Sequence, residues 1–221
     1  MKRVLGILTA GCLMFTLASP SSADEKGKAK PKADAPAKEA KTEMAGKMDE
    51  KAMAETMAKW EKFATPGPQH ARFKKMIGKW QTSTQAWMAP GAPPMESKGL
   101  AEFTVQMGGR FLIQTYKSEF MGKPFEGMGI EGYDNFKKKY SSYWIDNMGT
   151  ASMIQTGTCS DDGATCTYFG RMDEPTMDET DKTVKSTIQA KNEDSFLWSM
   201  YDFLPGGQEI KIMEINYTRV K

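Results

Sequence analysis

Side chains capable of catalysis or metal binding are scarce in this chain. It contains one histidine, His70, and three cysteines, Cys12, Cys159 and Cys166. A zinc site built from several histidines, or a nucleophile activated by a neighbouring base, needs a richer set than this. The 30 Lys and Arg residues nearly balance the 28 Asp and Glu residues, so no basic surface typical of nucleic-acid binding is indicated. These counts favour a binding or structural protein over an enzyme.

Polar and large side chains set among apolar neighbours are the better candidates for a ligand site. The candidates are Arg110, Tyr133, Trp144, Asp146, Met148 and Glu214. In such a site Arg110 would meet a carboxylate, while Trp144 and the methionines would line an apolar wall. In a structural alternative, Arg110 pairs with Asp146 or Glu214 and ties strands together. In a third reading, Asp146 or Glu214 is a general acid or base, although the sequence shows no nucleophile–base pair.

The first 23 residues have the pattern of a secretory signal peptide. Lys2 and Arg3 precede an apolar run over 4–18, and small residues follow up to Ala23, where we expect cleavage. The run is shorter than the roughly 20 residues that a membrane span needs. We therefore expect a periplasmic or secreted protein. In the alternative, Thr9-Ala10-Gly11-Cys12 is a lipoprotein box and an acylated Cys12 anchors the chain to a membrane, but Thr is a poor first residue for that box.

Export places the remaining two cysteines in an oxidising compartment. There, an isolated pair such as Cys159 and Cys166 is expected to form a disulfide. The segment between them contains Asp161-Asp162-Gly163, which favours a turn, so the bond would close a β-hairpin. A redox-active pair would need a Cys-x-x-Cys spacing or a helix start, and a metal site would need further ligands.

Two segments precede the folded domain. Residues 24–46 are almost entirely Lys, Ala, Glu, Asp and Pro, a composition that predicts a disordered linker. Residues 47–65 predict an amphipathic helix that docks on the folded domain or, through 47–63, on a cell-envelope partner. Its apolar face consists of Met48, Met53, Met57, Trp60 and Phe63. The methionine pairs Met44/Met48 and Met53/Met57 raise the alternative of a copper(I) site, but no His or Cys joins them.

Residues 66–221 form the folded domain. After a short helix over 69–77, apolar and polar residues alternate over 103–107, 184–190 and 196–200, with turn signals between such runs. About ten strands with no intervening helices predict an antiparallel up-and-down barrel, with a two-sheet sandwich as the alternative. Gly127-x-Gly129-x-x-Gly132 matches a dinucleotide fingerprint but lacks the following helix, so we assign these glycines to strand curvature. At a predicted hairpin tip, 137–139 is an all-lysine run, for which a solvated loop is favoured over anionic lipid.

A family resemblance appears at Gly78-Lys79-Trp80, which resembles the first strand of lipocalin-type (calycin) barrels. In those, a Trp closes one barrel end and a late Arg packs across it, roles that Trp80 and Arg219 would fill. More closely, the chain resembles a bacterial family of unknown function, number 1579. The matching stretches are 66–70, 77–80, 91–95, 108–112, 120–127, 132–135, 143–150 and 213–219. The resemblance implies a lipocalin-like barrel and brings no established activity. Barrels of similar shape bind haem through a His, but His70 precedes the barrel, so we expect no cofactor.

The sequence therefore predicts an exported barrel that holds a small apolar or amphipathic ligand. The alternatives are an envelope interaction module, in which 24–63 provides a tether and docking helix, and an enzyme that uses a buried carboxylate.

Overall fold

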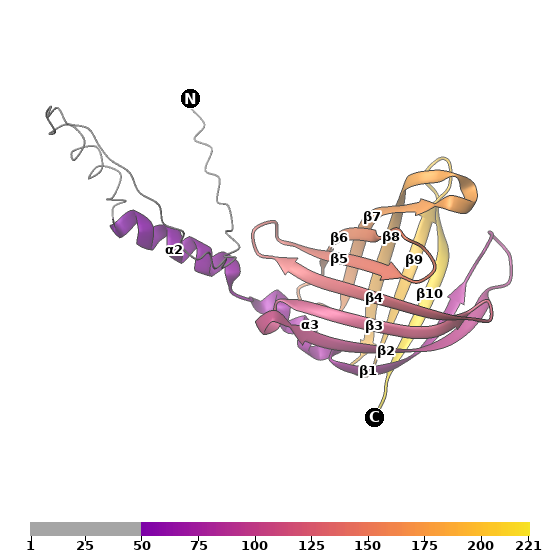
Figure 1. The fold of residues 1–221 in the computed structure, drawn as a ribbon, viewed down its shortest axis with the longest axis horizontal. Helices are drawn as coiled ribbons and strands as arrows, with labels where there is room; N and C mark the ends of the chain where they lie inside the picture. The colour runs from indigo at the N-terminus through magenta and orange to yellow at the C-terminus, as the bar shows by residue number, and fades with distance from the viewer. Residues whose placement is uncertain (1–49) are drawn as a thin grey trace, which may run out of the picture. The chain divides into compact units, whose positions relative to one another are not determined.

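The computed structural model describes residues 50–221, which comprise a helix, a short helical segment and a sheet (Figure 1). The helical elements are α2 (Glu50–Ala64), the 3-10 turn η1 (Pro68–His70) and α3 (Ala71–Met76). The strands are β1 (Gly78–Ala86), β2 (Met95–Gln106), β3 (Phe111–Phe120), β4 (Lys123–Asp134), β5 (Lys139–Asp146), β6 (Met153–Cys159), β7 (Thr165–Glu174), β8 (Glu179–Asn192), β9 (Ser195–Phe203) and β10 (Glu209–Arg219). The signal peptide and the linker predicted for 1–46 lie outside the described residues.

The ten strands form one closed barrel in which every neighbouring pair is antiparallel. Each strand pairs with the next in sequence, and β1 pairs with β10 to close the sheet. Trp80 thus lies between Ala101 of β2 and Arg219 of β10. The predicted up-and-down barrel is confirmed, and the sandwich alternative is wrong. Closure leaves no strand edge free for pairing with another chain.

The barrel interior follows the predicted alternation of side chains. In β8, Val184 and Ser186 are fully buried, and in β9, Phe196 and Met200 are buried. The alternation predicted through Met107 fails because β2 ends one residue earlier, and Met107 is 72% exposed. It opens a 3-10 turn, η2 (Met107–Gly109), in which Gly108 has a φ of 66°. A second such turn, η3 (Pro175–Met177), follows β7, so the expectation of no helix between strands was wrong at two short turns.

One end of the barrel is sealed by α3 and the start of β1. Phe73 and Trp80 are essentially inaccessible, and the Trp80 indole Nε1 donates a hydrogen bond to the Met76 carbonyl at 2.8 Å. The Arg219 guanidinium lies 4.1 Å from the centre of the Trp80 ring. It also donates to the carbonyls of Ile77, at 2.7 Å, and Lys75, at 2.6 Å. Trp80 and Arg219 are therefore in contact, and Arg219 links β10 to the segment between α3 and β1.

Helix α2 precedes this seal and buries none of its residues. The helix was predicted over 47–65 and is described from Glu50 to Ala64. Asn135, in the turn after β4, donates hydrogen bonds from Nδ2 to the carbonyls of Phe63 and Thr65, both at 2.8 Å. Among residues 50–221, no helix has the length and apolar character to cross a membrane.

The predicted disulfide joins Cys159 at the end of β6 to Cys166 on β7. The two residues are direct partners in the antiparallel ladder, so the bond closes the β6–β7 hairpin. Within the loop, Asp162 accepts hydrogen bonds from the Ser160 hydroxyl, at 2.6 Å, and the Ala164 amide, at 2.9 Å. Gly163, with a φ of 71°, supplies the left-handed residue that the turn needs.

Replacing both cysteines by alanine should lower the free energy of unfolding by about 2.5 kcal/mol, the loop-entropy value for an eight-residue loop. Urea unfolding measured with and without reductant checks this. Reductant should destabilise the wild type by a similar amount and leave C159A/C166A unchanged. A reductant effect on the double variant, or none on the wild type, would contradict the assignment.

Arg219→Met should lower the free energy of unfolding by about 2–4 kcal/mol. It removes hydrogen bonds to three backbone carbonyls, the ion pair with Asp194 and the contact with Trp80 together. Arg219→Lys should recover little of this, since an ammonium group cannot reproduce the planar fork. The matched control is Arg171→Met on the exposed face, where the guanidinium bonds the single carbonyl of Asp181. Equal urea midpoints for the two Met variants would show that Arg219 does not hold the seal.

Candidate functional site

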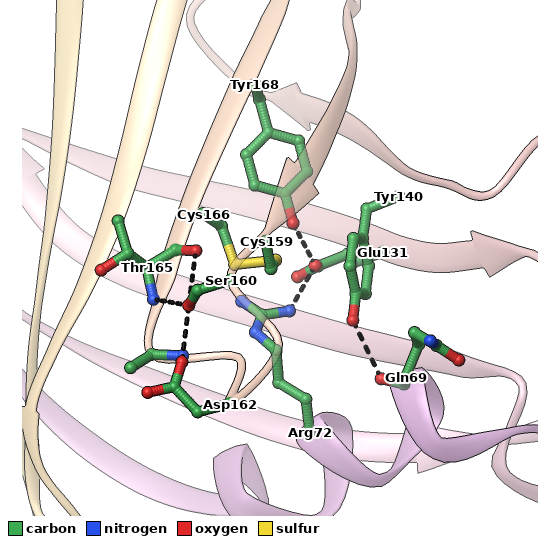
Figure 2. The surroundings of a disulfide bond; sticks show 11 residues. Gln69, Arg72, Glu131, Tyr140, Cys159, Ser160, Asp162, Thr165, Cys166 and Tyr168 are labelled. Atoms are coloured by element: carbon green, nitrogen blue, oxygen red, sulfur yellow. Dashed lines mark hydrogen bonds and ion pairs between the residues drawn. A yellow bond between two sulfur atoms is a disulfide. The ribbon is translucent and has the colours of Figure 1, made fainter.

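A buried ion pair forms the floor of the barrel at its sealed end (Figure 2). Arg72 extends from α3, is 8% exposed, and donates from Nη1 to Glu131 of β4 at 2.5 Å. The Tyr168 hydroxyl of β7 donates to the same carboxylate oxygen, also at 2.5 Å. Glu131 therefore joins α3 to two strands, on the inward face of the sheet.

The two charged side chains of this floor, Arg72 and Glu131, stabilise each other by direct contact. Burial alone would lower the pKa of Arg72, but the neighbouring Glu131 carboxylate raises that pKa above its ordinary value. Burial raises the pKa of Tyr168 well above its ordinary value, and the charge on Glu131 adds to the effect, so Tyr168 remains a neutral donor. Two buried nitrogens in the described part of the chain, Arg72 Nη2 and Gln155 Nε2, have no hydrogen-bond partner. These unpaired donors reduce the net stabilisation that the floor provides.

Aromatic rings and the disulfide surround the ion pair. The Arg72 guanidinium lies 5.5 Å from the centre of the Tyr140 ring, and the Tyr140 hydroxyl donates to the carbonyl of Gln69 at 3.1 Å (Figure 2). The β6–β7 loop covers the other side, because a Cβ on Gly163 would lie 3.3 Å from Cδ of Arg72. The sealed end is thus densely packed, and we assign these contacts a structural role.

The single histidine belongs to the same packing. His70 is buried, its Nδ1 accepts a hydrogen bond from the Gly67 amide at 3.0 Å, and its ring meets Phe73 and Tyr133 edge-on. Burial lowers the pKa of His70, so the neutral ring is favoured at neutral pH. Within residues 50–221, no three His, Cys, Asp or Glu side chains are grouped so as to hold a metal ion. His70 is therefore placed as a packing residue.

The middle of the barrel differs from the sealed end in its exposure. Several inward-facing apolar side chains pack against the core and yet keep exposed surface: Trp144 of β5, Ile188 of β8, Trp198 of β9 and Ile215 of β10. Their orientation follows from the alternation, because their neighbours two positions away, such as Tyr217, Phe196 and Ser186, are buried. Among residues 50–221, no α-helix covers the end opposite α3, which is called the open end below.

Near the open end, the side chains of Trp144 and Asp146 are in direct contact. The indole Nε1 of Trp144 donates to Oδ2 of Asp146 at 2.8 Å, and the Met148 amide donates to Oδ1 at 2.9 Å. The glycines of β4 make room for the indole, since a Cβ on Gly127 would lie 2.2 Å from Cζ2 of Trp144. From the sequence, we assign these glycines to strand curvature. They are also needed because the Trp144 ring lies very close to this strand. A shallow depression of the outer surface lies beside this pair and is lined by Glu126, Gly127, Met128, Ile145, Asp146 and Asn147.

Of the other predicted site residues, Tyr133, Arg110 and Glu214 lie apart from this pair, whereas the Met148 amide contacts it. Tyr133 is at the sealed end, where its ring centre is 4.8 Å from that of Tyr140. Arg110 follows η2, and its Nη1 donates to the Met107 carbonyl at 3.0 Å. Glu214 pairs with Lys211 at 2.5 Å. The alternative in which Arg110 pairs with Asp146 or Glu214 is thus wrong, because the turn after β2 turns Arg110 away from the barrel interior. Met148 follows the end of β5, and its side chain is exposed.

A second polar pair at the open end was missed from the sequence. Lys182 of β8 and Asp202 of β9 form an ion pair at 2.7 Å with both side chains partly buried. The Asp202 carboxylate is the main reason that the pKa of Lys182 is raised. Both residues continue inward alternations, Lys182 two positions before Val184 and Asp202 two positions after Met200. Extending the recognised alternations by one step would have placed them inside.

These features define a ten-stranded up-and-down β-barrel that a helix seals at one end. The chain belongs to the DUF1579 family, described as "Protein of unknown function (DUF1579)", which matches residues 65–219. This confirms the resemblance found in the sequence. A search among curated proteins found no match.

A comparison with solved structures also found similar chains. Rv2717c from M. tuberculosis is 16% identical, with a TM-score of 0.52, and the match covers 71% of this chain and 100% of that one. At this identity the likeness shows a shared fold. A redesigned β-barrel, b11L5F_LGL, is 13% identical over 67% of this chain and 95% of that one, with a TM-score of 0.36. Another, mFAP1 bound to DFHBI, is 14% identical over 66% and 97%, with a TM-score of 0.32.

Removing one partner of the buried pair should be strongly destabilising. Arg72→Met and Glu131→Gln should each lower the free energy of unfolding by about 3–5 kcal/mol, because each leaves an unpaired group at the floor. The double variant should lose less than the sum of the single losses, since the two residues contact each other. The exposed pair Lys117–Glu126 is the matched control, and K117M/E126Q should change stability by less than about 1 kcal/mol. Strict additivity at Arg72 and Glu131 would contradict this account.

Proposed function

We propose that the barrel binds one small apolar or amphipathic molecule in its interior, entering from the end opposite α3. The observation that carries the proposal is the partial exposure of inward-facing apolar side chains in the middle of the barrel, above a fully packed floor. Apolar surface facing solvent inside a barrel is costly unless something covers it. Barrels of about this size can enclose one small ligand. A ligand would remove that surface from water.

The chemistry of the lining supports an amphipathic ligand. Trp144, Trp198 and Ile215 supply apolar walls. Nearer the open end, Asp146 and the Lys182–Asp202 pair offer charged partners for a polar group of the ligand. A few convergent polar groups on an apolar wall are typical of small-molecule sites. We further propose that the protein acts in the periplasm or is secreted, which the Cys159–Cys166 disulfide supports.

An envelope interaction module is the second candidate function, and one observation favours it. Helix α2 leaves its apolar face uncovered, with Trp60 60% exposed. The enzyme alternative has less support. Both oxygens of Asp146 already accept hydrogen bonds, and Glu214 is paired with Lys211, so neither carboxylate is placed as a free general base.

Native mass spectrometry of gently purified protein is the first test. A small molecule bound at one copy per chain, identified after denaturing extraction, is the expected result. The uncharged fluorophore N-phenyl-1-naphthylamine then serves as a probe of the empty barrel and should bind at one site per chain. Failure of the protein to carry any extracted molecule or to bind this probe would overturn the proposal and favour the interaction module.

Two serines on neighbouring strands provide a matched pair of variants. Ser97 of β2 continues the inward alternation of Phe103 and Ala101 toward the end opposite α3, whereas Ser83 of β1 faces outward and is exposed. Ser97→Trp should fold, because it lies away from the packed floor, and should weaken probe binding at least tenfold by occupying the interior. Ser83→Trp should leave binding unchanged. If Ser97→Trp unfolds while Ser83→Trp does not, the interior is filled and the proposal fails.

A further inference from the structure

The turn between β4 and β5 presents one aromatic ring among lysines. Phe136 is 83% exposed, the largest exposure among the large apolar side chains in the described part of the chain. Lys137, Lys138 and Lys139 follow it directly, and all three are exposed. The exposed ring and the three positive charges therefore share one short turn.

Local hydrogen bonds hold this turn in a single conformation. The Asp134 carboxylate accepts from the amides of Phe136, at 2.7 Å, and Lys137, at 2.9 Å. The Lys138 amide donates to the Asp134 carbonyl at 2.8 Å, and Lys138 itself has a φ of 56°. The side chains are therefore presented by a preformed backbone, so little conformational entropy is lost when the turn binds a partner.

The same turn is tied to the C-terminal end of α2. Asn135 precedes Phe136 and donates to the carbonyls of Phe63 and Thr65 at the end of the helix. Phe63 and Trp60 are exposed, with their ring centres 5.6 Å apart. One and two further turns back along α2, Met57 and Met53 continue the exposed stripe. The turn and the C-terminal part of α2 thus join exposed aromatic rings to a cluster of positive charge.

We propose that this surface, made of 136–139 and the apolar stripe of α2, docks on a bilayer that contains anionic phospholipids. Exposed Trp and Phe side chains suit the headgroup boundary, where an apolar ring enters the acyl region. Lysines add attraction to anionic headgroups while their ammonium groups stay hydrated.

A protein partner fits the same surface less well. Lysine is depleted in protein–protein interfaces, because burying three adjacent ammonium groups requires partners for each of them. At a bilayer the same three groups remain at the wet surface while Phe136 and Trp60 insert. The charge next to the aromatic rings therefore favours a lipid surface over a protein surface.

The proposal is independent of a ligand in the barrel. The β4–β5 turn lies at the sealed end, where Tyr133 and Tyr140 flank it in the sequence and pack by α3. Docking through this turn would place the sealed end toward the bilayer and the open end toward the aqueous phase. Any ligand would then exchange with the aqueous side.

Co-sedimentation with vesicles tests the proposal. The chain as purified from cells is mixed with vesicles of phosphatidylcholine alone, or of phosphatidylcholine and phosphatidylglycerol. We expect binding to the anionic vesicles that weakens as salt is added. K137Q/K138Q/K139Q should weaken it about a hundredfold, at roughly fivefold per lysine. Phe136→Ser should weaken it about tenfold, the value for one exposed aromatic side chain that inserts.

Matched controls come from elsewhere on the barrel. Met121, in the β3–β4 turn at the open end, is 71% exposed, and Met121→Ser should leave vesicle binding unchanged. K98Q/K117Q/K123Q removes the same charge from other exposed positions and should reduce binding less than fivefold. Circular dichroism confirms that each variant retains the barrel.

Quenching by brominated lipid gives a readout that needs no destabilising change. Anionic vesicles of brominated lipid should quench part of the wild-type tryptophan fluorescence, and Trp60→Phe should remove most of that quenching. The proposal is overturned if the wild type does not bind the anionic vesicles, as expected for a surface that serves a protein partner. It is also overturned if binding is equal on both vesicle types and indifferent to the turn variants, as expected for an acylated Cys12.

Discussion

The difference between the two ends of this barrel depends on the ion pair between Arg72 and Glu131. Glu131 lies on the inward face of β4, where an unpaired carboxylate would be costly. Arg72 can neutralise it only if α3 lies across the barrel end, so the pair and the position of α3 require each other. Phe73 and Trp80 then complete a floor that excludes solvent. A ten-stranded sheet alone would be open at both ends.

The packed floor at one end contrasts with the exposed apolar surface in the middle of the barrel. Trp144, Trp198 and Ile215 pack against the core but stay only partly buried, unlike the floor beneath them. The glycines of β4 take part in this arrangement, because they let the Trp144 ring lie flat against the strand beside it. Position 127 must lack a Cβ for the indole to reach Asp146. Strand composition and interior shape are therefore linked at this point.

The parts of the fold that alternate were predictable from the sequence, and the parts set by turns were not. Period-two patterns around Val184 and Phe196 placed both sets of side chains inside, because burial on one face repeats every second residue. Arg110 was misplaced because β2 stops at Gln106 and a 3-10 turn redirects the chain. Glu131 was missed, although it shares its inward alternation with Gly127 and Gly129. A carboxylate in that position signals a buried partner, and the partner, Arg72, is 59 residues away in the sequence.

The distribution of charge follows the same division between the two ends. At the sealed end the floor carries one positive and one negative charge that cancel internally, so the outside of that end is free to carry lysines without disturbing the core. At the open end Lys182 and Asp202 keep their charges paired within the rim. Unpaired positive charge therefore gathers at the β4–β5 turn, where Asp134 orders the backbone but its single carboxylate leaves the three lysines in excess. Phe136, beside that charge, lies outside the core and is 83% exposed. The docking on an anionic bilayer that we propose accounts for this position.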